Sequence, residues 1–123
     1  MQYRVTAYVN VDPDNFFGYK PQHPIAEVDS FEIKAISPQG AAEGMFTVGN
    51  RMGCDIHGKC WPADVRSLSV GDVLKIVTPP CDEHPRGATG IYACASVGWE
   101  EIPEPPNPIV ELVGTAATSR VAP

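Results

Sequence analysis

The chain has 123 residues, of which 43% are hydrophobic and 20% are charged, which indicates a single globular domain. No run of about 18 apolar residues occurs in the sequence, which excludes an apolar membrane-spanning helix. The net charge is −6, and the lysines and arginines are scattered, so the basic stripe typical of nucleic-acid-binding proteins is missing. The 11 glycines and 13 prolines exceed the usual share and favour short regular elements.

The first elements in chain order are two strands joined by a loop. Residues 2–11 alternate between apolar and polar side chains, a pattern that predicts a half-buried strand, and the polar residues at 12–15 favour a turn after it. The loop that follows, up to Pro24, carries aromatic side chains that we expect to fold back onto the core: Phe16, Phe17 and Tyr19. Residues 25–36 form the second predicted strand.

The next element is a helix of about 12 residues. Ser37 supplies an N-cap hydroxyl, and Pro38 suits the first helical position. Gly49 and Asn50 form a plausible stop. Between them, apolar residues recur at steps of three and four, which places one stripe of the helix against the core: Ala41, Ala42, Met45, Phe46 and Gly49.

The second half of the domain is predicted to be a further pair of strands. A turn at 68–72 leads into a strand at 73–77, which the two prolines after it end because proline cannot donate to a ladder. A polar connection at 81–90 precedes a strand at 91–97. Residues 98–102 form a short final piece.

The predicted order is β-β-α-β-β, which favours an α+β fold: a small antiparallel or mixed sheet of about four strands with one helix packed on one face. We expect a single domain at 1–102 and a proline-rich extended tail at 103–123. The side chains expected to be mostly buried between the helix and the sheet are Val5, Val9, Ile33, Phe46, Val73, Ile76, Ala93 and Ala95.

The four cysteines bear on the compartment. The N-terminal residues lead directly into the first alternating segment, without the apolar core of a signal peptide. We therefore expect a cytoplasmic protein whose thiols stay reduced. Cys94 lies in an apolar run and is interpreted as a small buried hydrophobic residue.

Two Cys-x-x-His pairs are candidate metal ligands. Cys54 with His57, and Cys81 with His84, could together supply the four nitrogen and sulfur ligands of tetrahedral zinc, with Cys60 as a substitute. Familiar structural zinc sites usually contain a Cys-x-x-Cys pair, which this chain lacks. The alternative is a pair of polar loops with free thiols, so we expect no bound metal and no cofactor.

Catalytic signatures are missing from the sequence. It contains no phosphate-binding GxxxxGK[ST] loop, no GxGxxG and no HExxH. A cysteine beside a histidine could act as a nucleophile, but no cysteine is marked as activated. We therefore expect a protein that is not an enzyme.

Two segments and the tail combine residue types that are common in interfaces. Tryptophan and arginine are typical anchors, and an apolar strand behind prolines is pre-extended for docking. The alternatives are an aromatic lid over the sheet edge with a structural Arg–carboxylate pair, and a tail strand that joins its own sheet. The candidate interface residues are Trp61, Arg66, Trp99, Glu100, Glu101, Ile109 and Leu112.

The segment RSLSVGDV at 66–73, followed by GWEEI at 98–102, resembles small uncharacterised proteins of actinobacteria, their plasmids and their phages. It is more distantly similar to the YodL-like domains of bacterial mobile elements. The resemblance covers about 40 residues and implies a phage-borne or plasmid-borne accessory gene, but no catalytic residue. In physical terms, Gly71 permits a positive φ, and Asp72 can accept hydrogen bonds from the turn.

These observations favour a non-enzymatic accessory protein of a phage or mobile element that binds a host or partner protein, in the host cytoplasm. Two alternatives stay open. One is a small-ligand or zinc-binding domain, and the other is a nucleic-acid-related or antirestriction protein, against which the scattered lysines count.

Overall fold

The computed structural model describes residues 1–13, 18–103, 109–113 and 116–121, the last two ranges as backbone only. Within these residues the chain forms one helix and seven strands: β1 (Gln2–Asn10), β2 (Ile25–Lys34), α1 (Pro38–Gly49), β3 (Val73–Thr78), β4 (Ala88–Cys94), β5 (Trp99–Ile102), β6 (Ile109–Val113) and β7 (Ala116–Val121).

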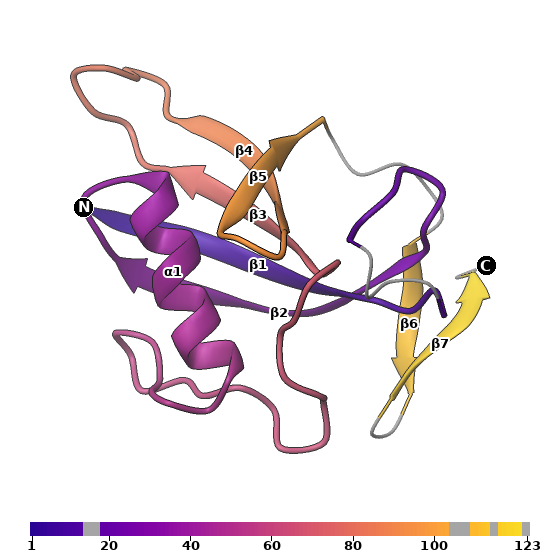
Figure 1. Ribbon diagram of the computed structural model, residues 1–123. Coiled ribbons are helices and arrows are strands. Elements are labelled where there is room, and N and C mark those ends of the chain that lie inside the picture. The colour runs from indigo at the N-terminus through magenta and orange to yellow at the C-terminus, as the bar shows by residue number, and fades with distance from the viewer. Residues whose placement is uncertain (14–17, 104–108, 114–115, 122–123) are drawn as a thin grey trace.

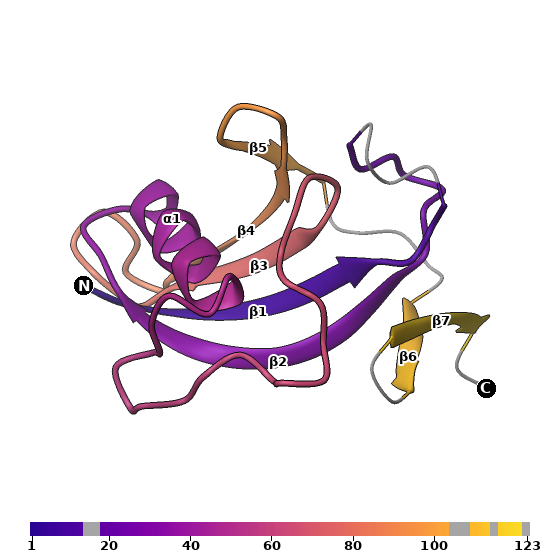
Figure 2. The same cartoon turned by 60° about the horizontal axis from the view of Figure 1, so that its bottom comes forward.

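The strands form one sheet in the order β5-β4-β3-β1-β2-β6-β7. The first five strands pair in antiparallel fashion, and β6 joins β2 in parallel at Ile25 and Ala26. The predicted α+β class with one helix on one face is confirmed, with more strands than the four expected. Figure 1 shows β6 and β7 near the end at which β2 begins, and Figure 2 shows α1 on one side of the curved strands β1 and β2.

The helix begins and ends at the predicted residues. Ser37 is the N-cap, and its Oγ accepts the N–H of Gly40 at 3.0 Å. Pro38 occupies the first turn, and the C-cap residue Asn50 donates its backbone N–H to Phe46 O at 3.0 Å. The capping residues were therefore sufficient to predict where this helix begins and ends.

The main core lies between α1 and the sheet. It includes buried side chains from β1, β2, β3 and α1: Tyr3, Val5, Ala7, Val9, Phe31, Ile33, Ala41, Ala42, Met45, Val48, Leu74 and Ile76. Phe46 was predicted to be core but is only partly buried. It lies at the helix margin, where its ring meets Trp99 edge-on at 6.1 Å between centroids.

A second, smaller core lies on the other face of the sheet. Its buried residues are Tyr8, Ile25, Val73, Ile91 and Ala93. Val73 and Ala93 are buried as predicted, but the prediction that they lie beneath the helix is wrong. Period-two alternation separates the two faces of a strand without saying which face the helix covers. Tyr19 packs against this second core, whereas Phe16 and Phe17 lie outside the described residues.

Two strands end earlier in the structure than the sequence analysis predicted. The strand expected at 91–97 ends at Cys94, so Ala95 is only partly buried and Val97 is 90% exposed. The strand expected at 25–36 ends at Lys34, and Ile36 is 95% exposed. In both cases the apolar alternation of the sequence continues beyond the last residue of the strand.

Candidate functional site

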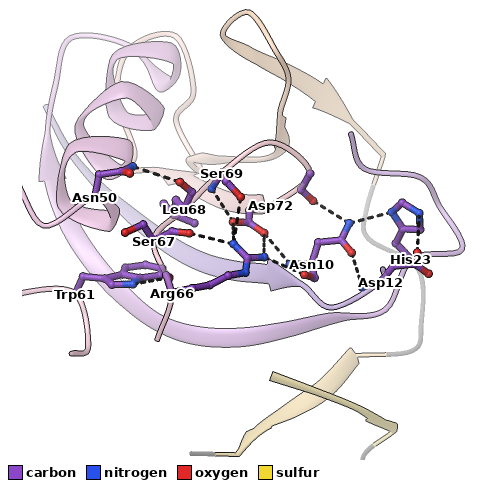
Figure 3. A network of polar contacts seen from close by, with 11 residues as sticks. Asn10, Asp12, His23, Asn50, Trp61, Arg66, Ser67, Leu68, Ser69 and Asp72 are labelled. Atoms are coloured by element: carbon purple, nitrogen blue, oxygen red, sulfur yellow. Dashed lines mark hydrogen bonds and ion pairs between the residues drawn. The ribbon is translucent and has the colours of Figure 1, made fainter. Parts of the chain in front are cut away.

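An ion pair between Arg66 and the buried carboxylate of Asp72 anchors the loop before β3 to the end of β1 (Figure 3). Arg66 Nη1 donates to Asp72 Oδ2 at 2.8 Å, and Nη2 donates to Oδ1 at 2.7 Å. Asp72 is 0% exposed, whereas the Arg66 side chain is 41% exposed. Arg66 also donates to Asn10 O at 2.9 Å. The guanidinium therefore joins the loop directly to the β1 backbone.

Backbone donors complete the surroundings of the carboxylate. The N–H groups of Asn10 and Ser69 each donate to Asp72 at 2.8 Å. Burial raises the pKa of Asp72, and the bonds from Arg66 oppose that rise. The same bonds raise the pKa of Arg66. The carboxylate is thus surrounded by donors, as a buried charge requires.

The Asn10 side chain extends the network to a histidine that the sequence analysis did not single out (Figure 3). Asn10 Nδ2 lies 2.9 Å from His23 Nδ1 and 3.0 Å from Gly71 O. His23 is 3% exposed, and its Nδ1 also accepts the Lys20 N–H at 3.2 Å. Because Nδ1 accepts, we assign the proton to Nε2, which lies 3.7 Å from Asp12 Oδ1. The network holds Asp12, Lys20 and His23 near the end of β1.

Both tryptophans point into the core. Trp61 is 5% exposed, stacks on Phe31 at 6.0 Å between ring centroids, and donates its Nε1–H to Val65 O and Arg66 O. Trp99 is 8% exposed. Contacts within the chain therefore explain the positions of Trp61, Trp99 and Arg66, and no partner protein is needed to explain them.

The remaining interface candidates lie on β5, which is an edge strand, and on β6, which lies between β2 and β7. Glu100 and Glu101 are exposed on β5. Ile109 and Leu112 belong to β6, and their side chains lie outside the described residues.

The loop at 54–60 contains a disulfide between Cys54 and Cys60, so the expectation that these thiols stay reduced is wrong. The tight turn between them brings their Cα atoms to 4.4 Å, which spacing alone could not reveal. Within the loop, Asp55 accepts the N–H groups of Glu32, His57 and Lys59 at 2.8–2.9 Å. Burial acts to raise the pKa of Asp55, but these bonds outweigh it and lower the pKa.

The same loop covers part of the outer edge of β2. Ile56 donates its N–H to Glu32 O at 3.1 Å, and Lys59 Nζ donates to Ser30 O and Asp29 Oδ1 at 2.8 and 3.0 Å. Backbone groups that β6 does not reach are satisfied in this way.

The second Cys-x-x-His segment forms a tight turn. Cys81 and His84 exchange backbone hydrogen bonds at 2.9 and 3.1 Å, and the Cys81 thiol is free. Cys54 is unavailable as a thiolate ligand while it is in the disulfide. Among the described residues, no group of three or more His, Cys, Asp or Glu side chains is placed to hold a metal ion. Cys94 is buried as expected, and burial raises the pKa of its thiol to about 11.

Two of the clefts among the described residues are lined by both apolar and polar side chains. One, of about 380 Å³, lies beside the 81–84 turn and is lined in part by Met1 and Ile36. The other, of about 420 Å³, lies beside β5 on the face opposite the helix, and Tyr19, Glu100 and Ile102 help to line it. The Tyr19 hydroxyl is buried without a hydrogen-bond partner. Sequence analysis missed this cleft because it forms where two distant segments meet.

Comparison of the chain with protein-family models, curated proteins and solved structures finds no match. Within the described part of the chain, no helix has the length and apolar character needed to cross a membrane.

Proposed function

We propose that the chain is a non-enzymatic accessory protein of a phage or mobile element, and that it binds a host or partner protein by adding an extended basic segment of that partner to the edge of β5. The observation that carries the proposal is the position of β5 at one end of the sheet. There it pairs with β4 on one side, and no described strand pairs with the other side. Strand addition to such an edge is a recurrent mode of peptide recognition.

The outward backbone groups of β5 can be identified from its pairing. Cys94 donates its N–H to Asp72 O and accepts the Gly71 N–H, both at 2.8 Å. Cys94 therefore bonds toward β3 and forms a non-hydrogen-bonded pair with Trp99. Because the two kinds of pair alternate, Glu101 also directs its N–H and C=O away from β4.

One outward carbonyl already has a donor from the helix. Gln39 Nε2 donates to Trp99 O at 3.2 Å, which supports the inferred direction of that carbonyl. An added strand would have to displace Gln39 or pair beyond it.

The charge of the edge favours a basic partner. Glu100 and Glu101 are both exposed, and the whole chain carries a net charge of −6. Two copies joined edge to edge would bring these carboxylates together, and like charges on paired strands repel. A lysine- or arginine-containing segment complements the same edge.

The positions of three cationic side chains count against a nucleic-acid-binding function. Arg51 donates to Ser67 and to loop carbonyls, and Lys59 and Arg66 are in ion pairs. These cations are therefore held by contacts within the chain rather than grouped to bind phosphates.

The disulfide bears on the location of the protein. Disulfides are typical of oxidising compartments, and this one weighs against the cytoplasmic location that the rest of the proposal implies.

The test uses a blocked seven-residue peptide of threonine and valine with a central lysine, titrated against the protein by NMR. Binding should shift the amide signals of β5. Glu101→Pro removes an outward N–H and should abolish binding, whereas Glu101→Thr, the matched control, retains that N–H. Gln39→Ala frees the Trp99 carbonyl and should tighten binding about two- to fivefold, from a hydrogen bond of about 0.5–1 kcal/mol. Equal binding by all four proteins would refute the proposal.

A further inference from the structure

The cleft beside β5 is a candidate recognition pocket. Its lining combines apolar side chains with a carboxylate and two hydroxyls: Tyr19, Val70, Ser96, Glu100 and Ile102. We propose that this cleft receives a lysine side chain from the strand that adds to β5. The inference rests on the proposed function, because strand pairing delivers the lysine to the cleft.

Alternation along β5 directs the right residues toward the cleft. Trp99 packs in the helix-side core, whereas Ile102 packs against the core on the other face. Glu100 shares the face of Ile102, since the two residues are at positions i and i+2 of the strand. A side chain opposite Glu100 on an added strand would lie about 4.5–5.5 Å from it, measured between Cβ atoms. The cleft lies on the β4 side of β5, where Ala93 and Cys94 also line it, so a partner side chain reaches it only by extending past Glu100, which requires a long side chain.

The chemistry of the lining fits an ammonium group on an apolar stem. A lysine offers three N–H donors, and the lining residues that carry acceptor oxygens in their side chains are Glu100, Ser96 and Tyr19. Val70 and Ile102 provide apolar surface for the four methylene groups. The buried Tyr19 hydroxyl, which lacks a partner in the free protein, would gain one on binding. Burial also raises the pKa of Tyr19, which keeps this hydroxyl neutral.

Acidic and purely apolar side chains fit the lining of the cleft less well than lysine does. An acidic side chain would face the Glu100 carboxylate, and like charges repel. A purely apolar side chain would cover the Tyr19 hydroxyl without giving it a partner, which costs free energy. A lysine avoids both penalties.

The experiment compares two peptides, two tyrosine variants and one glutamate variant. Norleucine at the central position of the peptide retains the lysine stem but removes the ammonium group. We expect the lysine peptide to bind wild-type protein about tenfold more tightly than the norleucine peptide, as for a hydrogen bond to a charged group. Tyr19→Phe should reduce this difference, because the ammonium group then retains only the acceptors of Glu100 and Ser96, and Glu100→Gln should remove most of it. Tyr19→Phe should leave the melting temperature unchanged or higher, because the hydroxyl has no partner in the free protein.

Tyr92→Phe is the matched control, because Tyr92 packs against the helix-side core and should leave the preference for lysine intact. Equal affinity for the two peptides in wild-type protein would overturn the lysine pocket while leaving strand addition in place. Binding of neither peptide would overturn strand addition itself. If N-acetyl-lysine methylamide bound as tightly as the lysine peptide, the cleft would be a small-molecule site, and delivery by a strand would be wrong.

Discussion

Replacing Arg66 by methionine should lower the free energy of unfolding by about 3 kcal/mol. Removing one partner of a fully buried ion pair costs about 3 to 5 kcal/mol. Asp72 is 0% exposed, but the Arg66 side chain is 41% exposed, so water can reach the vacated position. Asp72 also retains its bonds from Asn10 and Ser69. Both features favour the lower end of the range.

The assay is equilibrium unfolding in urea, followed by tryptophan fluorescence. With a denaturant slope of about 1.5 kcal/mol per molar, the midpoint should fall by about 2 M. Arg86→Met is the matched control, because Arg86 is exposed, and such substitutions usually change stability by less than about 0.5 kcal/mol.

A double variant separates the pair from its surroundings. Arg66→Met combined with Asp72→Asn removes the charge together with its partner, so the combined loss should be smaller than the sum of the single losses. A loss below about 1 kcal/mol for Arg66→Met alone would refute the view that a buried charge depends on this guanidinium.

Three further changes test other parts of the fold. Replacing Cys54 and Cys60 by serine opens a loop whose ends are six residues apart and should cost about 2 kcal/mol, measured in urea against the oxidised protein; equal midpoints would contradict this. The lowered pKa of Asp55 means that its contribution to stability is complete above its ordinary pKa of about 3.9 and is lost as the pH falls through its folded value. Asp55→Asn should therefore flatten the acid limb of a stability–pH profile, and an unchanged limb would contradict the assignment. Gly87→Ala places a Cβ 2.7 Å from a β3 carbonyl oxygen, whereas Gly58→Ala meets nothing within 4 Å at a similar positive φ; thermal melts should show Gly87→Ala to be the worse by about 1–3 kcal/mol, and equal losses would show that the contact relaxes.

Local signals in the sequence predicted the elements whose causes are local. The helix bounds followed from Ser37 and Pro38 at one end and Asn50 at the other, because capping depends on residues within one turn. The turn before β3 followed from Gly71, whose φ is 93°. Neither feature depends on contacts far along the chain.

The features that sequence analysis missed depend on distant contacts. Alternation placed Val73 and Ala93 inside without indicating which face the helix covers. It also continued to Val97, which the turn after β4 leaves exposed. The disulfide depends on a turn that brings two Cα atoms together, and no periodicity encodes that distance. The cleft requires Tyr19 to meet β5, some 80 residues away.

The candidate site of Figure 3 and the proposed edge are joined by backbone bonds. Arg66 fixes Asp72, whose C=O accepts the Cys94 N–H, while Gly71 donates its N–H to Cys94 O. Cys94 lies opposite Trp99 at the start of β5, and the next residue, Ala95, donates its N–H to Gly98 O at 3.0 Å. Each contact in this series constrains the next, so the ion pair helps to set the position of the β5 backbone. A preformed edge loses less conformational entropy when a strand is added. The ion pair would therefore contribute to affinity from a distance, and Arg66→Met should weaken peptide binding even under conditions in which the protein remains folded.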